Sequence, residues 1–416
     1  MVGSRWRRAL GVLLAVPALA LATACTAEPN ASWRGGDGAP AGSSAPAGSG
    51  LLAITPATGT AGVPVLDPVT VTAQDATLQS VALTNEAGKQ VTGEYDADKH
   101  SWHSTEPLGY GKAYTVNATA TTVKGEQVTQ TSRFTTLKPA KLAMPYLRAN
   151  QTTLLGTGKT FGVGQPIVVW FDRPIIDKVA AEQSLQVITN PPVEGRWHWF
   201  DKQEVHWRPP HYWKPGTKVV VNAKVYGVKL GDGLYGEADR TASFTIGPSK
   251  IAVADSNTKH MLVYVNGALV RDVPVSLGKG GIVQGVNGPV NYWTNSGPHV
   301  IVDKDPVVRM TSASNGIVDP NDPNFYDEEV KLAMRVSYSG EFVHLADWNI
   351  PAHGVRNTSH GCINVGPAHA QWMYDNFGLG DVVDVLNTPR RLDPRNGLGD
   401  WVLSWADWVK GSALTA

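Results

Sequence analysis

Hydrophobic and polar residues alternate in short runs from Leu51 to about Leu137, and Gly, Asn, Asp and Pro separate runs such as "VTVTA" and "AYTVNATATT". A two-residue period is typical of strands with one buried face, and several short strands at this spacing indicate an antiparallel sandwich. A second block of the same kind runs from about Met144 to Gly247. The pattern therefore predicts two β-sandwiches, at residues 51–138 and 144–247.

The two blocks also match each other. "GKAYTVNATA" at Gly111 corresponds to "GTKVVVNAKV" at Gly216, and "SRFTT" at Ser132 corresponds to "ASFTI" at Ala242. Tandem copies of one sandwich explain these matches best. The second copy carries the aromatic cluster "RWHWFDKQEVHWRPPHYW". Its tryptophans follow a two-residue alternation, which favours a core or inter-domain position over the alternative of a sugar-stacking surface.

The pattern changes after Pro248. Two strands around Asn266-Gly267 form a type I′ hairpin signal, and a long loop-rich region runs from Gly278 to Asp327. An alternating run from Val336 to His344 then predicts a strand, the text from Pro367 predicts a helix, and "GDVVDVLN" predicts a closing strand. We expect a C-terminal domain over residues 249–388 and an extension over residues 389–416.

The first residues form an export signal. A basic start is followed by an apolar stretch too short to span a membrane, which predicts a signal peptide over residues 1–24. Cys25 follows in an imperfect lipoprotein cleavage box, so lipidation of Cys25 is expected, the alternative being an ordinary signal peptide. The Gly/Ser/Pro/Ala-rich residues 25–50 predict a flexible tether. The chain is therefore expected at the outer face of a bacterial membrane, attached only by a lipid anchor.

The composition of the chain argues against nucleic-acid binding and favours a strand-rich fold. The chain has 36 basic and 36 acidic residues, so its formal net charge is zero. This balance gives no electrostatic reason to expect nucleic-acid binding. The 43 glycines and 28 prolines suit many strands and turns rather than long helices.

The candidate chemistry lies in "RNTSHGCINVGPAHAQW", which contains the second of only two cysteines, Cys362. A thiol attacks as the thiolate and has a pKa of about 8.5 when free, so it needs a base nearby. His344 is the better base because it lies on a separate strand, whereas His360 is only two residues from the thiol. His353 lies in the intervening loop, where a solvent-exposed role is expected.

Gly361 lets the backbone approach a substrate, and amides around His360, Gly361 and Cys362 are candidates for an oxyanion site. Two alternatives stay open from the residues alone. Cys362 is either a nucleophile or a small buried residue beside a structural histidine. A Cys/His metal site is a weaker alternative, since one cysteine and scattered histidines do not make a zinc spacing. We therefore expect neither a metal nor another cofactor.

The run "HLADWNIPAHGVRNTSHGCINV" resembles the signature of the L,D-transpeptidase family, in which fourteen residues separate a histidine from Ser-His-Gly-Cys. "VSYSGEFVH" and the tail "NGLGDWVLSWADWVKG" are similar to actinobacterial lipoprotein members of that family. The resemblance implies a mainly β chain, with two tandem immunoglobulin-like sandwiches followed by a β-rich catalytic domain and a short helix after the catalytic cysteine.

The resemblance also implies a reaction on peptidoglycan during cell-wall synthesis. Cys362 would attack the carbonyl of the third residue of a tetrapeptide stem and release D-alanine. His344 would be the base, held by the backbone carbonyl of Leu345, and an amine of a second stem would complete a 3→3 cross-link. β-Lactams of the carbapenem class are the expected inhibitors. L,D-Carboxypeptidase activity is the alternative outcome of the same chemistry.

Further positions carry over from the resemblance one at a time. Substrate contact is implied for a set of six residues: Met310, Tyr326, Ser339, Gly340, Trp348 and Asn364. One position departs from the family, because Leu345 stands where close relatives have serine. The departure matters only if the serine hydroxyl, rather than the carbonyl, orients His344.

Three rival classes of protein agree less well with the sequence. A sortase needs an arginine shortly after its cysteine, and here the first are Arg390 and Arg391, beyond the closing strand. Papain-like peptidases have cysteine before histidine, the reverse of the order found here. A non-catalytic wall-binding lipoprotein would be free to lose Cys362, His344 and Gly361, and all three are present.

Overall fold

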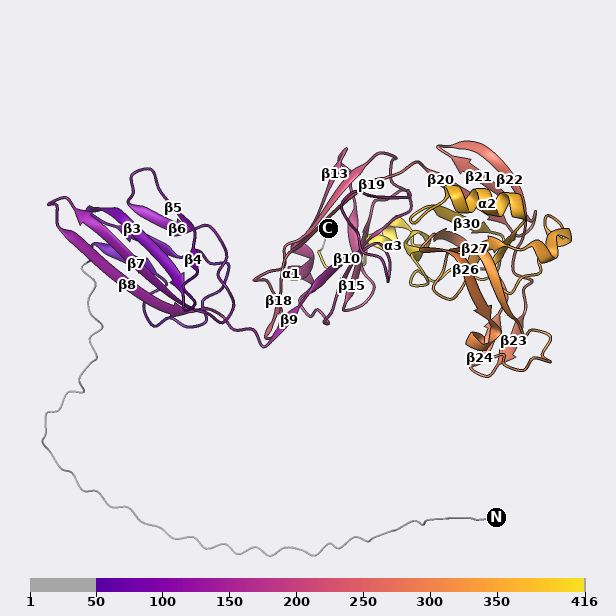
Figure 1. The fold of residues 1–416 in the computed structure, drawn as a ribbon, viewed down its shortest axis with the longest axis horizontal. Helices are drawn as coiled ribbons and strands as arrows, with labels where there is room; N and C mark the ends of the chain where they lie inside the picture. Colours follow the sequence, from indigo (N-terminus) through magenta and orange to yellow (C-terminus); the bar gives the residue numbers. More distant parts are fainter. Residues whose placement is uncertain (1–49, 415–416) are drawn as a thin grey trace, which may run out of the picture. The chain divides into compact units, whose positions relative to one another are not determined.

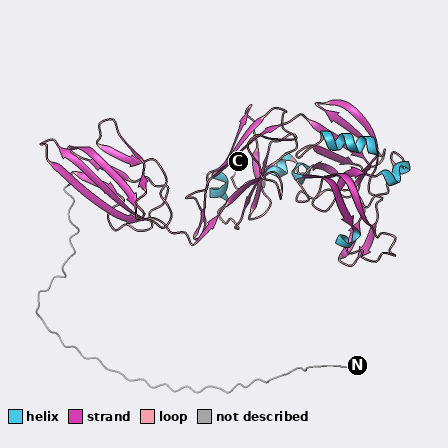
Figure 2. Ribbon diagram, viewed as in Figure 1, coloured by secondary structure: helices cyan, strands magenta, loops and turns pink. Residues whose placement is uncertain are grey.

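The computed structural model describes residues 50–414, and most of their regular structure is strand (Figures 1 and 2). The predicted signal peptide, Cys25 and nearly all of the predicted tether lie outside the described residues.

The first sandwich consists of two four-stranded sheets. One sheet has the order β1 (Leu52–Thr55), β2 (Thr70–Ala73), β6 (Ser101–Ser104), β5 (Gly93–Tyr95). The other has the order β4 (Gln90–Val91), β3 (Ala76–Asn85), β7 (Ala113–Thr122), β8 (Gln127–Thr135). In β7 the alternate residues Tyr114, Val116 and Ala118 are buried, as the sequence pattern predicts.

The second sandwich repeats this plan. Its sheets have the orders β10 (Pro145–Arg148), β12 (Ile167–Phe171), β15 (Glu204–Arg208), β14 (Arg196–Trp199) and β11 (Lys159–Phe161), β19 (Arg240–Ile246), β16 (Lys218–Ala223), β13 (Leu185–Asn190). A small sheet of β17 (Lys229–Gly231), β18 (Leu234–Gly236) and β9 (Lys141–Ala143) and the helix α1 (Lys178–Gln183) complete it. Trp197, Trp199 and Trp207 are at most 8% exposed and belong to its core, which favours the core interpretation of the aromatic cluster.

The C-terminal part is built on a nine-stranded sheet. Its order is β25 (Gly297–Val300), β30 (Val382–Leu386), β20 (Lys250–Asp255), β21 (His260–Val265), β22 (Ala268–Ser276), β29 (Ile363–Val365), β28 (Phe342–Leu345), β27 (Asp327–Arg335), β26 (Asp303–Thr311). Asn266 and Gly267 join β21 to β22 with φ of 50° and 83°, so the predicted type I′ hairpin is confirmed. A separate hairpin consists of β23 (Ile282–Gly285) and β24 (Gly288–Asn291).

Short helices follow the sheet at several points. The 3₁₀ helices are η1 (Ser312–Asn315), η2 (Asp347–Ala352) and η3 (Gly399–Val402), and α3 spans Trp405–Val409. Helix α2 (Pro367–Asn376) begins five residues after Cys362, with Pro367 in its first turn where no N–H is needed. The mainly β fold with a short helix after the cysteine is therefore confirmed.

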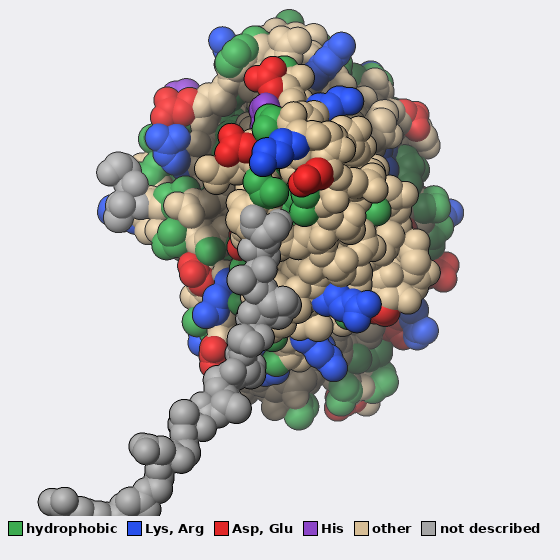
Figure 3. Space-filling model, turned by 90° about the vertical axis from the view of Figure 1, so that its left-hand side faces the viewer, with side chains coloured by type: hydrophobic (Ala, Val, Ile, Leu, Met, Phe, Trp, Pro, Cys, Tyr) green, Lys and Arg blue, Asp and Glu red, His purple; other side chains and the backbone are tan. Residues whose placement is uncertain are grey.

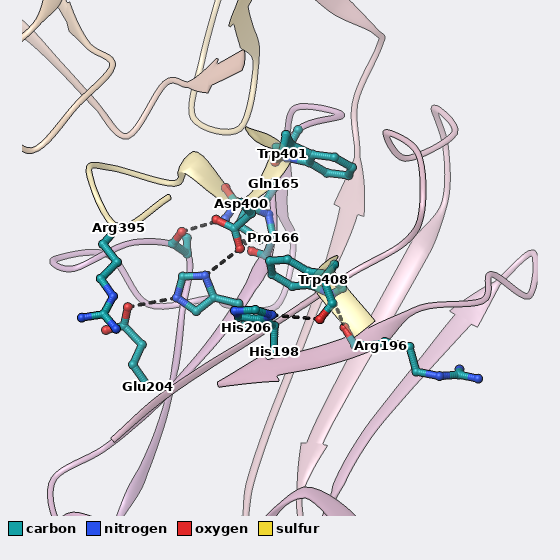
Figure 4. Close-up of polar contacts among 12 residues, drawn as sticks. Gln165, Pro166, Arg196, His198, Glu204, His206, Arg395, Asp400, Trp401 and Trp408 are labelled. Carbon is teal, nitrogen blue, oxygen red and sulfur yellow. Dashed lines mark hydrogen bonds and ion pairs between the residues drawn. The ribbon is translucent and has the colours of Figure 1, made fainter. Parts of the chain in front are cut away.

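The C-terminal extension packs against the second sandwich (Figure 4). Trp408 is fully buried, and its indole N–H donates to the Arg196 carbonyl at 2.9 Å. His206 of β15 lies between two carboxylates, with Nδ1 2.7 Å from Asp400 and Nε2 3.0 Å from Glu204. The contacts of Asp400 and Trp408 join segments 194 and 212 residues apart in the sequence and attach the extension to the sandwich.

The surface shows no gathering of one charge on the face drawn in Figure 3, where basic and acidic side chains are interspersed. This agrees with the zero formal net charge of the chain. None of the helices within residues 50–414 is long and apolar enough to cross a membrane.

Candidate active site

One pocket, of about 930 Å³, contains nearly all of the predicted site residues. Its lining includes Met310, Tyr326, Ser339, Gly340, His344, Trp348, His360, Gly361, Cys362 and Asn364. Leu345 is not part of the lining and acts on the site only through its contact with His344. The structure therefore brings together residues that the sequence separates by more than fifty positions.

Two parallel strands position the central pair. β28 and β29 pair with His344 opposite Asn364 and Val343 opposite Ile363. Val343 and Ile363 are buried in the apolar core, so alternation turns His344 and Asn364 to the other face. Cys362 immediately precedes β29, two residues before Asn364, and therefore shares the face of His344.

His344 is held as a neutral base. Its side chain is buried, and Nδ1 lies 2.8 Å from the Leu345 carbonyl, which can only accept a hydrogen bond. The proton therefore resides on Nδ1, and Nε2 keeps its lone pair. Burial lowers the pKa of His344 to about 4 despite the favourable carbonyl contact. Trp348 stacks on the imidazole at 5.9 Å between ring centroids.

Cys362 is held as a neutral thiol. Burial raises the pKa of the thiol to about 12, and the nearby carboxylates of Glu341 and Glu328 act in the same direction. Sγ donates to the Gly340 carbonyl at 3.7 Å. Attack requires the thiol proton to pass to a base, so this hydrogen bond must be exchanged for one with an imidazole nitrogen.

The backbone at Gly361 has a conformation that favours glycine, with φ of 137°. Its N–H donates to Ser359 Oγ at 3.1 Å, and Ser359 Oγ donates to the Cys362 carbonyl at 2.6 Å. The Gly361 amide was among the predicted oxyanion donors. Since it is already bonded here, any oxyanion site in this conformation depends on the neighbouring amides of His360 and Cys362.

His360 lies among aromatic rings rather than beside a proton acceptor. It stacks on Tyr326 at 4.7 Å and meets Tyr292 edge to face at 4.9 Å between ring centroids. Burial, followed by the charge of Lys279, lowers the pKa of His360 to about 4. Burial likewise raises the pKa of the Tyr326 hydroxyl to about 12, so both rings are neutral near pH 7. The stack forms one wall of the pocket.

The pocket also contains a buried carboxylate that sequence reasoning missed. Glu341 accepts from the backbone N–H and the side-chain amide of Asn295, at 2.7 and 2.6 Å. His299 Nε2 lies 3.8 Å away. Despite burial, these partners keep the pKa of Glu341 below its usual value. The only sequence signal was the position of Glu341 beside Gly340, because Asn295 is 46 residues distant.

The Leu345→Ser substitution tests whether the family serine matters. The carbonyl that holds His344 belongs to the backbone and is kept in this variant. Leu345 packs against the apolar core, so the variant is expected to be less stable. Among folded molecules we expect the rate of Cys362 acylation to change by less than about threefold, because the carbonyl contact that orients His344 is retained. Acylation rates measured well below the unfolding temperature check this, and a gain of tenfold would show that the hydroxyl contributes.

Comparison with known proteins finds two matching domain models and similar chains. A model described as a bacterial Ig domain matches residues 60–229, and one described as the L,D-transpeptidase catalytic domain matches residues 249–385. L,D-transpeptidase 5 of Mycobacterium tuberculosis is 35% identical over 87% of this chain and 77% of its own length. A solved L,D-transpeptidase in complex with imipenem is 31% identical, with a TM-score of 0.47 over 58% of this chain and 99% of that one.

A further relative covers most of both chains. L,D-transpeptidase 2 of Mycobacterium tuberculosis is 43% identical over 85% of this chain and 83% of its own length. The match spans the sandwiches as well as the pocket, so it is not limited to the short motif around Cys362. On this similarity and on the matched catalytic domain, the chain belongs to the L,D-transpeptidase family.

Proposed function

We propose that the chain forms 3→3 cross-links in peptidoglycan, with Cys362 as nucleophile and His344 as general base. One observation carries the proposal. A neutral imidazole, with Nδ1 fixed by the Leu345 carbonyl, shares a pocket and a strand face with the free thiol of the described chain. An acceptor nitrogen beside a nucleophile is the arrangement that covalent acyl transfer needs.

Acylation begins when Nε2 of His344 takes the thiol proton as Sγ attacks the carbonyl carbon of the third stem residue. The carbonyl oxygen becomes an oxyanion, for which the His360 and Cys362 amides are the proposed donors. The C–N bond then breaks, and the imidazolium returns the proton to the departing amine of D-alanine. A thioester between Cys362 and the stem remains.

Deacylation reverses these roles. The side-chain amine of a second stem attacks the thioester and gives its proton to His344, and Sγ leaves and recovers a proton. The free energy of the peptide bond broken in the first step is retained in the thioester and drives formation of the new amide, so no nucleotide is consumed. Water in place of the amine would give L,D-carboxypeptidase activity, which is the second outcome of the same thioester.

The pocket walls are proposed to hold the stem. Tyr326 and Met310 lie on the β26–β27 side, whereas Ser339 and Gly340 form the turn before β28. Trp348 is half exposed and Asn364 is buried opposite His344, so the two line the pocket at different depths. Polar groups at its floor and aromatic groups at its rim suit a peptide with apolar and amide portions.

Export and anchoring stay part of the proposal. We propose that residues 1–24 direct export, that Cys25 is lipidated, and that the sandwiches hold the catalytic domain away from the membrane as a spacer. Deleting the first sandwich in cells tests the spacer role. Reduced 3→3 cross-linking with normal protein level is expected, and unchanged cross-linking would count against it.

The reaction itself is tested with a disaccharide-tetrapeptide as the only substrate. Mass spectrometry should detect free D-alanine and a 3→3-linked dimer with the wild-type chain and neither with Cys362→Ala. A tripeptide without dimer would identify carboxypeptidase activity instead. Absence of all three products would contradict the enzyme and favour the non-catalytic wall-binding alternative.

A further inference from the structure

The turn between β27 and β28 contacts the thiol of Cys362. Gly340 has φ of 99°, and its carbonyl accepts the hydrogen bond from Cys362 Sγ. The turn is closed by bonds from the Val336 N–H to the Glu341 carbonyl and from the Glu341 N–H to Ser337 Oγ, at 2.9 and 3.0 Å. A displacement of this turn would therefore move both the pocket wall and the group that holds the nucleophile.

Asn396, from the C-terminal extension, bonds to this turn at two points. Its Oδ1 accepts from the Ser339 N–H at 2.8 Å, and its Nδ2 donates to Ser339 Oγ at 2.8 Å. A carboxamide offers an acceptor and a donor side by side, so one side chain satisfies both groups. Asn396 does not line the pocket itself and reaches it only through Ser339.

Asn396 is itself part of a fixed segment. Its N–H donates to the Asp393 carbonyl at 2.9 Å, and the adjacent Gly397 packs against the backbone of Val336 and Ser337. Arg395 donates to the Phe200 carbonyl in the second sandwich, and Leu398 is buried. Because this segment is itself held in place, its two hydrogen bonds can fix the turn. In a flexible tail, the same bonds would be offset by the entropy lost on ordering the tail.

We propose that Asn396 is a positioning residue for the acylation step, acting by fixing the Ser339–Gly340 turn, which forms the pocket wall beside Cys362 against which the stem would lie. The inference rests on the proposed function for its chemistry. It assigns to the C-terminal extension, which lies outside the matched catalytic domain, a role in the geometry of the pocket wall through Ser339.

The test compares Asn396→Ala with Asn396→Asp in the full chain. Aspartate keeps an acceptor for the Ser339 N–H and a second oxygen that can accept from the Ser339 hydroxyl, so it is the conservative variant. Asn222→Ala is the matched control, because Asn222 also makes two side-chain hydrogen bonds, to Gln186 and Thr241, but lies in the second sandwich. Three quantities are measured: the rate of acylation by a carbapenem, normalised to the concentration of titratable thiol, the rate of alkylation by iodoacetamide, and the unfolding midpoint.

We expect Asn396→Ala to slow acylation by about tenfold, the effect of losing one to two net hydrogen bonds, and to speed alkylation as the thiol leaves Gly340. Asn396→Asp should restore both rates to within about threefold. Both alanine variants lose side-chain hydrogen bonds and should have slightly lower unfolding midpoints, so rates are compared at a temperature at which every variant is folded. Unchanged rates in Asn396→Ala, or an equal loss of rate in Asn222→Ala, would each overturn the inference. If the wild-type chain forms no carbapenem adduct and releases no D-alanine from a tetrapeptide stem, the proposed function fails, and alkylation alone decides the role of Asn396.

Discussion

Replacing His344 by glutamine is expected to slow acylation of Cys362 by about 10²- to 10⁴-fold, the usual contribution of a general base. The thiol has its pKa raised to about 12, so only a small fraction is thiolate near pH 7 without assistance. His344 has its pKa lowered to about 4 and is therefore available as a base over the whole neutral range. Stopped-flow acylation by a carbapenem measures the loss.

The pH dependence gives a second measure of the same role. The wild-type rate should stay nearly constant from pH 7 down to about pH 5, because His344 is still unprotonated there. In His344→Gln the rate should instead rise with pH, since only spontaneous thiolate reacts. His353→Gln is the control, because His353 contacts Asn349 and does not line the pocket. Equal losses in the two variants would contradict the assignment of His344.

Replacing His206 by alanine is expected to lower the free energy of unfolding by about 3–5 kcal/mol, the usual effect of removing one partner from a buried ionic group. His206 is 3% exposed and lies between Asp400, which is fully buried, and Glu204 (Figure 4). Without the imidazolium, the Asp400 carboxylate would remain buried opposite a neutral side chain. Urea unfolding followed by tryptophan fluorescence measures the change.

The same group gives stability a defined pH dependence. Burial opposes protonation of His206, but Asp400 and Glu204 outweigh it and raise the pKa from 6.5 to about 10. Because His206 binds its proton more tightly in the folded state, protonation stabilises the fold. This contribution is fully present below pH 6.5 and is lost as the pH rises from 6.5 through about 10. His206→Ala should lack that decline, whereas His211→Ala, at an exposed position, should retain it. A wild-type chain equally stable at pH 6.5 and 10 would contradict the account.

Local pattern was enough to predict most of the fold. Alternation identified the strands of both sandwiches, and Asn266-Gly267 identified a hairpin, because each depends on residues that are neighbours in the sequence. The motif around Cys362, with His344 at its family spacing, identified a set of side chains that the structure places in one pocket. A parallel strand pair explains the spacing, since the chain must leave β28 and return beside it in β29.

The groups that hold the site could not be predicted in the same way. Ser339 and Asn396 are 57 residues apart, and His206 and Asp400 are 194 apart. Both pairs join the extension to residues far away in the sequence, so no local period marks them. The hydrogen bond that occupies the Gly361 amide was equally hidden, because it depends on the rotamer of Ser359 rather than on residue type.

The central claim is that Cys362 is the nucleophile of an acyltransferase. Intact-mass spectrometry of the purified chain after incubation with a carbapenem tests it most directly. We predict one added mass equal to the β-lactam, located on the peptide that contains Cys362, and no adduct in Cys362→Ala folded to the same degree. An adduct that persists in Cys362→Ala, or a wild-type chain that forms none and releases no D-alanine from a tetrapeptide stem, would contradict the account.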